Sequence, residues 1–585
     1  MKQSLFCSLL AATVLSGTAF GAVVKISGEE GAWHLERNGK PYFIRGAGGV
    51  ADYERFAAMG GNSVRTWGAD QAARQLDEAA RYGVTVTVGF WLAHQNEGAN
   101  YVDAKWCDAV TEGVLKTVRE VKDKPGLLMW ALGNEMELGV ADEEALWKYM
   151  NYLAGKVKEI DPDHPVGTVV AEVWPAKAEK IMRLAPNLDW LGINSYGGAM
   201  DVGKRWREMG GKKPYVITEF GPPGPNELGL NSFGSPREWT STAKADWYEK
   251  IYRNNMIADR GRYCLGSYAF IWGYKVEGTP SWFGLSTPEG ETLAAAERLQ
   301  MLWDRKPLEN RVPTIEPMKI ARDRLESPDE TLTASVSAAD PDGDKLTYTW
   351  TLVPELGYLG ETFGAKLPPR HDEAILKGQG SPKVTVKPVG GGKWRLYCTV
   401  RDGKGGAANA SESIFVKGPP PPKLAQPEQL PCAVFAPGAP ARWWGTGYMG
   451  DAGNLKIEWH HPDGAKECIK VEYSGGDWAG LLWQDPPGDW NNADGGYNLV
   501  GSKKLVFRAR GSKGGERINF QVGGGRGAYP DSDIAKLENQ KLEKEWKTYT
   551  IPLSGKKLDC IKTGFGFSFG GQGAVKFYLD DIRYE

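Results

Sequence analysis

The chain has 585 residues, which is too long for one hydrophobic core, so about two to four domains are expected. Its formal net charge of -2 gives no electrostatic reason to expect nucleic acid or an anionic membrane surface as a partner. The unusual feature of the composition is its 23 tryptophans and 75 glycines. An indole ring offers an apolar face with a polar edge, which suits the C–H face of a sugar, although a tryptophan is more often simply part of a core.

The amino terminus has the layout of a secretory signal peptide. Lys2 precedes an apolar run over residues 5–15, and small residues follow it. We therefore expect residues 1–21 to be a signal peptide and the mature chain to be exported to the periplasm, the cell surface or the medium. No later run approaches the roughly 20 apolar residues that a membrane-spanning helix needs.

Six cysteines follow the expected signal peptide, and an oxidising compartment would permit disulfides between them. They fall along the chain in groups of two, one and three, which leaves the disulfide pairing open and favours some free thiols. They are Cys107 and Cys264, then Cys398, then Cys432, Cys468 and Cys560.

Between about residues 40 and 306, apolar runs typical of buried strands alternate with amphipathic segments typical of helices. This alternation predicts a (β/α)8 TIM barrel, assigned to residues 22–310. An open doubly wound sheet is the alternative, but GAGG at residues 46–49 lacks the glycine spacing of the phosphate-binding turn of that fold. The eight predicted strands are 42–46, 62–67, 84–90, 127–133, 165–170, 189–194, 214–219 and 264–272, and the last is followed by a helical segment at 291–305.

Two of these predicted strands end on a glutamate. LLMWALGNEME, residues 127–137, stops at Asn134-Glu135, and YVITEFG, residues 215–221, ends with Glu219. The carboxyl ends of barrel strands meet at one mouth, so the two carboxyl groups are expected to face each other. They could instead be caps of the following helices, because glutamate is common in a first turn. Facing carboxyl groups predict a retaining glycosidase, in which one carboxyl group protonates the leaving oxygen and the other attacks the anomeric carbon. The two carboxyl groups of such an enzyme stand about 5–5.5 Å apart.

Other predicted strand ends supply polar and aromatic side chains that could bind a sugar. Arg65 and the Tyr196 hydroxyl could support an ionised nucleophile. Trp272 is the tryptophan that we most expect to stack on a sugar, whereas His94 and Glu172 are expected to be structural or merely loop-borne. The expected substrate-binding residues are Arg65, Trp67, Trp91, Asn134, Asn194, Tyr196 and Trp272, and Trp174 also follows a predicted strand.

The motifs NSVRT, GNE, NSY and TEFG, with the Trp272 position, resemble the barrel motifs of clan A glycoside hydrolases. NGKPYFIRG, NSVRT and LGNE are most similar to the catalytic domain of family 2, over about residues 38–306. This resemblance implies that Glu135 is the acid/base, that Glu219 is the nucleophile, and that Asn134 contacts the 2-hydroxyl of the sugar.

The chain departs from the family 2 pattern at two places. Family 2 usually has His-Tyr-Pro after the Arg-Thr of strand two, whereas this chain has Trp67-Gly-Ala-Asp70. Family 2 also usually has sandwich domains ahead of the barrel, and here only a short hairpin-like segment precedes it. Both departures leave the substrate open.

Other chemistries have less support in the sequence. No glycine-rich turn coupled to a lysine follows a predicted barrel strand, which disfavours phosphate chemistry. The six histidines are scattered apart from the adjacent His460-His461, which disfavours a zinc site, so we expect no required cofactor. The remaining alternatives are a β-glucan transglycosylase that uses the same two glutamates, and a non-catalytic cell-surface carbohydrate-binding protein built on an inactive barrel.

Residues 313–417 contain short β-rich runs between turn clusters, which predicts an Ig-like β-sandwich, and we expect it to act as a spacer. Its segment ADPDGDKLTYTW resembles polycystic-kidney-disease or cadherin-like repeats. Asp340, Asp342 and Asp344 fit the start of a calcium loop, but an EF-hand also needs a carboxylate at the twelfth position, where Thr351 stands. A solvated turn is therefore expected.

A proline-rich linker, residues 418–429, is expected to be extended, and residues 430–585 predict a jelly-roll β-sandwich. The closing KFYLDDIRYE resembles the last strand of carbohydrate-binding modules, which makes Asp580 or Asp581 a candidate ligand of a structural calcium. We expect a poly- or oligosaccharide partner. The candidate stacking residues are Trp443, Trp444, Trp478, Trp483 and Trp490, of which at least half are expected to be core.

Overall fold

The computed structural model describes residues 21–585 except 174–176, 304–307, 357–366, 419–427, 429, 436–441, 465, 493–494 and 528. The expected signal peptide, except residue 21, and most of the expected linker thus lie outside the described residues. The chain forms two compact units, Met1–Pro421 and Pro422–Glu585, which we describe separately. Within the described ranges, no helix is both long enough and apolar enough to cross a membrane.

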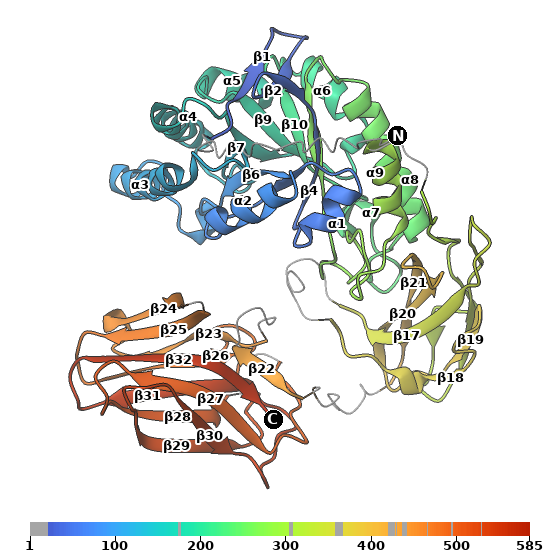
Figure 1. Ribbon diagram of the computed structural model, residues 1–585. Helices are drawn as coiled ribbons and strands as arrows, with labels where there is room; N and C mark the ends of the chain where they lie inside the picture. Colours follow the sequence, from blue (N-terminus) through green and yellow to red (C-terminus); the bar gives the residue numbers. More distant parts are fainter. Residues whose placement is uncertain are drawn as a thin grey trace, which may run out of the picture. The chain divides into compact units, whose positions relative to one another are not determined.

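The first unit contains the predicted TIM barrel, which is confirmed (Figure 1). Eight parallel strands close in the order β10-β11-β4-β5-β6-β7-β8-β9. They are β4 (Ile44–Gly48), β5 (Ser63–Arg65), β6 (Thr85–Phe90), β7 (Leu127–Leu132), β8 (Val166–Ala171), β9 (Trp190–Asn194), β10 (Tyr215–Phe220) and β11 (Cys264–Ala269). The helices are α1 (Tyr53–Ala58), α2 (Ala72–Arg81), η1 (Gln95–Glu97), α3 (Ala104–Val121), α4 (Glu143–Ile160), α5 (Lys177–Leu184), η2 (Ala199–Asp201), α6 (Val202–Glu208), α7 (Pro225–Leu228), α8 (Ser241–Ile251), η3 (Tyr252–Ile257) and α9 (Ala294–Trp303).

The barrel forms because its strands can be buried on both faces. Every residue of β6, β7 and β10 is buried, and these strands are rich in β-branched and large apolar side chains. The surrounding helices each turn one apolar face toward the strands. In α3, for example, Val114, Leu115, Val118 and Val121 are buried, and the opposite face is charged.

A small amino-terminal sheet closes one end of the barrel. It consists of β1 (Val24–Ser27), β2 (His34–Arg37) and β3 (Lys40–Tyr42), which corresponds to the hairpin-like segment expected before the barrel. Val24 and Leu35 share a buried apolar cluster with Ile44 and Leu128, which stand at the starts of β4 and β7. The opposite mouth, at the carboxyl ends of the strands, is the one that carries polar side chains.

A β-sandwich follows the barrel within the same compact unit. Its core is built around Trp350 and Trp394. The strands are β12 (Thr314–Ile315), β13 (Lys319–Ile320), β14 (Arg324–Leu325), β15 (Leu332–Ser335), β16 (Ala338–Ala339), β17 (Thr347–Pro354), β18 (Ile375–Lys377), β19 (Lys383–Val386), β20 (Gly392–Arg401) and β21 (Ala407–Val416), with η4 (Asp372–Ala374).

The second unit is a β-sandwich of two antiparallel sheets, in agreement with the expected jelly-roll (Figure 1). One sheet has the order β24-β25-β32-β27-β30, with β22 beside β32, and the other has the order β23-β26-β31-β28-β29. The strands are β22 (Cys432–Phe435), β23 (Trp444–Gly450), β24 (Leu455–Asp463), β25 (Lys466–Tyr473), β26 (Trp478–Gln484), β27 (Lys504–Gly511), β28 (Arg517–Gly523), β29 (Ile534–Lys541), β30 (Lys547–Pro552), β31 (Thr563–Gly570) and β32 (Val575–Tyr584), with η5 (Ala452–Asn454).

Some cysteines are free thiols, as the sequence indicated. Cys107, Cys264, Cys398 and Cys468 form no disulfide. Burial raises the pKa of both Cys264 and Cys398 to about 12, so these two thiols stay protonated at neutral pH and are poor nucleophiles.

Candidate active site

The parallel register of the barrel brings the polar strand ends together at one mouth. Asn194 at the end of β9 pairs with Glu219 of β10 on one side and with Ala171 of β8 on the other. Arg65 ends β5 opposite Gly48 of β4. Because the strand ends lie at similar heights, side chains from distant parts of the chain can reach one another here.

Glu219 is surrounded by hydrogen-bond donors. Arg65 Nη1 donates to its Oε1 at 2.8 Å, Trp67 Nε1 donates to the same oxygen at 2.7 Å, and Tyr196 Oη donates to Oε2 at 2.7 Å. The guanidinium and the indole N–H can only donate, so these contacts suit an ionised carboxylate. The Glu219 side chain is only 9% exposed, and the Arg65 side chain beside it is 1% exposed.

Tyr196 remains a neutral donor to this carboxylate. Burial, and then the negative charge of Glu219, raise the pKa of Tyr196 well above its ordinary value. The phenol therefore keeps its proton at any physiological pH. Its hydrogen bond holds one Glu219 oxygen in a fixed direction.

Glu135 lies just beyond the end of β7 in a different environment. Burial is the largest cause that raises the pKa of Glu135 to about 7, and the negative charge of Glu219 is the second. Its backbone has a φ of 54°, in the left-handed region that costs a non-glycine residue about 1 kcal/mol. The Glu135 N–H donates to the Val169 carbonyl at 2.8 Å, which fixes this conformation. Such strain is typical of functional sites.

Two asparagines connect the carboxyl groups. Asn134 Oδ1 accepts from Arg65 Nη2 at 2.6 Å, and Arg65 also holds Glu219. Asn194 Nδ2 donates to Asn134 Oδ1 at 3.1 Å and to Glu135 Oε1 at 2.8 Å. Both carboxyl groups are therefore positioned by one continuous network.

Neither glutamate is a helix cap. The cap of α4 is Asp142, whose side chain accepts from the Ala145 N–H at 2.9 Å. Glu219 lies within β10, and the next helix begins only at Pro225. The capping alternative therefore does not describe either residue.

Trp67, one of the two departures from the family pattern, belongs to this network. Its indole N–H binds Glu219, and its ring lies 5.2 Å from the Arg65 guanidinium carbon. Gly48 makes room for this ring, because a Cβ there would come within 2.5 Å of the indole. Trp67, which stands where family 2 usually has the histidine of His-Tyr-Pro, thus helps to hold the Glu219 carboxylate.

The Trp272 side chain does not lie beside Glu219 but packs against a helix. Strand β11 ends at Ala269, three residues before the predicted end, and the Trp272 ring packs edge-on against Phe56 of α1 at 5.0 Å. Phe270 instead lies by the site, 5.8 Å from the rings of both Trp67 and Tyr196. No local signal in the sequence marks this exchange, because the apolar run continues past Ala269, where the strand ends.

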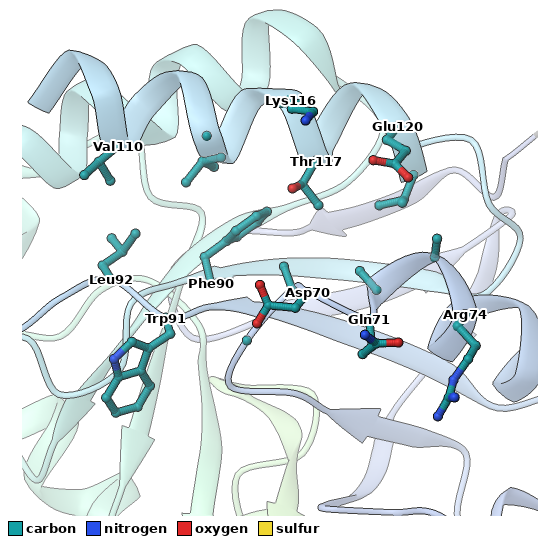
Figure 2. A pocket seen from close by; sticks show the side chains of 17 residues that line it. Asp70, Gln71, Arg74, Phe90, Trp91, Leu92, Val110, Lys116, Thr117 and Glu120 are labelled. Carbon is teal, nitrogen blue, oxygen red and sulfur yellow. The ribbon is translucent and has the colours of Figure 1, made fainter. Parts of the chain in front are cut away.

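Trp91 lies at the rim of a groove beside the mouth (Figure 2). Its side chain is 51% exposed, and its indole N–H donates to Glu97 at 3.3 Å. The groove, about 510 Å³, runs between residues 68–74 and helix α3, and Trp91 points away from that helix. Trp91 is therefore accessible to a ligand, and its indole N–H binds Glu97 rather than either of the two carboxyl groups.

The remaining strand-end residues have structural roles where they are described. Glu172 pairs with Arg205 at 2.8 Å and accepts a hydrogen bond from Ser195. His94 is the N-cap residue of η1, and its backbone N–H donates to Glu97 at 2.9 Å. Trp174 lies outside the described residues.

Two charged residues near the site carry no recognisable signal in the sequence. The Lys275 ammonium lies 5.0 Å from the centre of the Phe270 ring and 3.0 Å from Glu277. The charge of Glu277 contributes to the raised pKa of Tyr196. Both residues stand on the long segment between β11 and α9, where no periodic pattern marks a position.

The candidate metal ligands lie in the sandwiches. Within the described part of the chain, the aspartates at 340, 342 and 344 form the one group of three acidic side chains whose oxygens lie within 4.8 Å of one another. Lys404 already pairs with Asp344 at 2.8 Å. Asp580 pairs with Arg508 and Asp581 with Arg583, so neither belongs to a cluster of ligands.

A comparison with known families identifies the barrel. Residues 47–255 match the family described as "Glycosyl hydrolases family 2, TIM barrel domain". Over these residues the barrel is similar to the TIM barrel domain of family 2 glycosyl hydrolases. The match includes both glutamates and the Arg65 network, and it ends before Phe270 and Lys275. No curated protein matches the chain.

Solved structures that resemble the chain at low identity include two β-glucuronidases and a putative β-galactosidase. Bifidobacterium dentium β-glucuronidase, complexed with coumarin-3-O-glucuronide, is 19% identical over 49% of each chain, with a TM-score of 0.39. Bacteroides uniformis β-glucuronidase is 12% identical over 96% of this chain and 67% of its own, with a TM-score of 0.37. A putative β-galactosidase from Bacteroides fragilis is 15% identical over 68% of this chain and 58% of its own, with a TM-score of 0.38. The chain thus spans about half the length of the first of these.

Proposed function

We propose that this protein is an exported retaining β-glycosidase that hydrolyses a β-linked poly- or oligosaccharide. The observation that carries this proposal is the contrast between the two carboxyl groups in the family 2 barrel. Glu219 receives three donors that suit an anion, whereas the pKa of Glu135 is raised to about 7, so it can hold a proton. Two carboxyl groups with different protonation are what double displacement requires.

The reaction would proceed in two steps. Glu219 attacks the anomeric carbon and forms a covalent ester while Glu135 gives its proton to the departing oxygen. Glu135, now ionised, then takes a proton from water, whose oxygen attacks the anomeric carbon and releases Glu219. Asn134 Oδ1 is occupied by two donors, so its amide N–H group is the part that would reach the 2-hydroxyl of the sugar.

A panel of aryl β-glycosides tests this function, followed by a polysaccharide panel with sizing of the products. Proton NMR should show a first-formed product with the β configuration. An inverted product would mean that the carboxyl groups stand too far apart for a covalent intermediate. Adding an acceptor sugar separates hydrolysis from transglycosylation, because a transglycosylase would form a longer saccharide. If no substrate of either panel is hydrolysed, the result would favour a binding protein built on an inactive barrel.

The pKa of Glu135 predicts a basic limb in the pH profile. The acid catalyst must be protonated, and its pKa is about 7, so kcat/KM for a substrate with a poor leaving group should fall as the pH rises through about 7. The measurement is kcat/KM against pH, and Glu135→Gln is the control because an amide does not titrate. If the limb persists in the variant, it belongs to another group.

We also propose that the second unit binds polysaccharide. Trp443 and Trp483 are buried in its core, whereas Trp444, Trp478 and Trp490 are each more than two-fifths exposed. Trp444 and Trp478 stand on the neighbouring strands β23 and β26, and the Trp478 indole covers Gly450, where a Cβ would come within 2.8 Å of the ring. Exposed indoles of this kind can stack on sugar rings.

Expressed alone, residues 430–585 should fold and remain bound to an insoluble glucan or a similar polymer in a pull-down assay. The double variant Trp444→Ala with Trp478→Ala should lose retention without loss of folding, because both side chains are about half exposed. Tyr529→Ala in the same fragment is the control, since it removes an exposed aromatic side chain that lies on neither β23 nor β26. Failure of the wild-type unit on every polysaccharide of the panel would leave it a structural role only.

A further inference from the structure

A buried arginine connects the first β-sandwich to the barrel. Arg395 of β20 is 2% exposed, and its Nε donates to Glu355 of the same sandwich at 2.9 Å. Its Nη2 donates to the Pro236 carbonyl of the barrel at 2.7 Å, and its Nη1 lies 3.7 Å from the Glu238 carboxylate. A charge enclosed in this way must be balanced by the groups around it, because water cannot reach it.

Glu238 is the centre of this cluster on the barrel side. Its side chain is 2% exposed, and it accepts from Lys244 at 2.6 Å, from Ser281 at 2.8 Å and from the sandwich residue Ser411 at 3.0 Å. Burial opposes its ionisation, but the charges of Lys244 and Arg395 outweigh burial and lower the pKa of Glu238. The two domains therefore share one buried ionic network.

The same network holds a segment that reaches the active site. Ser281 is fixed twice, because its hydroxyl binds Glu238 and its carbonyl accepts from Lys244 at 2.7 Å. Two residues further on, the Phe283 ring lies 5.2 Å from the Tyr196 ring and 5.3 Å from the Phe270 ring. Tyr196 in turn donates to Glu219 at 2.7 Å.

We propose that the first β-sandwich is part of the catalytic unit, and that Arg395 and Glu238 are positioning residues that hold segment 279–285, and through it Tyr196, against Glu219. This role rests on the proposed glycosidase function. It differs from the spacer role expected from the sequence, since a spacer would need no buried ion pairs with the barrel.

The physical basis is dense packing around fixed charges. Phe283, Phe270 and the neighbouring Trp282 form one apolar cluster, and Tyr196 packs against it. Such a cluster cannot deform smoothly, so a shift at Ser281 would move the rings that border Tyr196. A displacement of about 1 Å at a reacting group can cost on the order of 100-fold in rate.

Three full-length variants test the proposal. Ser281→Ala removes the hydroxyl that binds Glu238 and leaves the sandwich intact, and Arg395→Met removes the charge. Arg324→Met is the matched control, because Arg324 also joins the sandwich to the barrel, through Ser232, but is exposed and has no contact with segment 279–285. Ser281→Thr restores a hydroxyl and should restore the wild-type behaviour.

The first measurement is kcat on an aryl β-glycoside that the wild-type enzyme hydrolyses, per active site titrated with a 2-fluoro glycoside. We expect Ser281→Ala and Arg395→Met to lower kcat about 10-fold to 100-fold with a smaller change in KM, and Arg324→Met to stay within about twofold of wild type. A purely structural role would lower the number of active sites and the Tm, and would leave kcat per site unchanged. That result would overturn the proposal.

The second measurement does not need activity. Hydrogen exchange in the full chain should be faster in peptides covering residues 193–198 and 279–285 of Ser281→Ala, and unchanged in α3. Unchanged exchange at 193–198 would overturn the proposal, even if Arg395→Met fails to fold. If the wild type hydrolyses no glycoside, the proposed function fails, and the exchange experiment still decides whether the sandwich positions Tyr196.

Discussion

Replacing Glu219 with glutamine is expected to abolish turnover on every substrate, with a loss on the order of 10⁴-fold or more in kcat. An amide cannot form the covalent ester with the anomeric carbon. Among the described residues, Glu135 is the one other carboxyl group in the Arg65 network, and in the proposed mechanism it serves as the acid. Steady-state rates on an activated aryl glycoside and on the natural substrate should therefore fall together.

The loss of turnover in Glu219→Gln must be distinguished from a loss of folded protein. Glu219→Gln leaves the buried Arg65 without a counter-charge, which costs stability by about 3 kcal/mol. A cooperative unfolding transition, followed by circular dichroism, would show that the variant is folded. Glu172→Gln is the matched control, because it changes another strand-end glutamate that pairs with an arginine, and it should keep turnover. Residual activity near that of the control would show that Glu219 is not the nucleophile.

Replacing Glu135 with alanine is expected to have an effect that depends on the leaving group. Activated aryl glycosides need little protonation of the departing oxygen, so their first step should be nearly unchanged, whereas natural substrates should react several orders of magnitude more slowly. The covalent intermediate should then accumulate, because no base remains to activate water. Burst kinetics with a dinitrophenyl glycoside measure this directly.

Azide provides the second arm of this experiment. It is a nucleophile that needs no general base, so it should restore turnover of Glu135→Ala and form a β-glycosyl azide, since attack on the intermediate restores the starting configuration. Glu219→Ala treated with azide should give the α product or no product. Equal losses for both variants on activated and natural substrates alike would mean that the acid/base role belongs to a different residue.

Much of the barrel could be predicted from local sequence. The apolar runs at 127–132 and 215–220 are buried on both faces, and only a strand covered by helices and filled from within can bury every residue of such a run. Because parallel strands end at one mouth, the positions of Glu135 and Glu219 followed from the ends of these two runs. The partners of Glu219 at Arg65 and Tyr196 followed from the same rule.

Other features depended on geometry that local patterns do not carry. Phe270 rather than Trp272 borders the site because β11 ends earlier than the apolar run does, and only the folded chain fixes where a strand stops. The contact of Trp67 with Glu219 needs the space that Gly48 leaves on a neighbouring strand.

The sequence by itself thus determined the barrel, the positions of the two glutamates and the sandwiches. Local runs of apolar residues mark the strands, and the polar residues that follow them mark where the strands end. The tertiary structure alone decided that the pKa of Glu135 is raised, since burial and neighbouring charge set a pKa and both depend on residues far apart in the chain. It also decided that Arg395 of the sandwich meets Glu238 of the barrel. A buried charge is paired in space, and the sequence separation of the two partners gives no sign of that pairing.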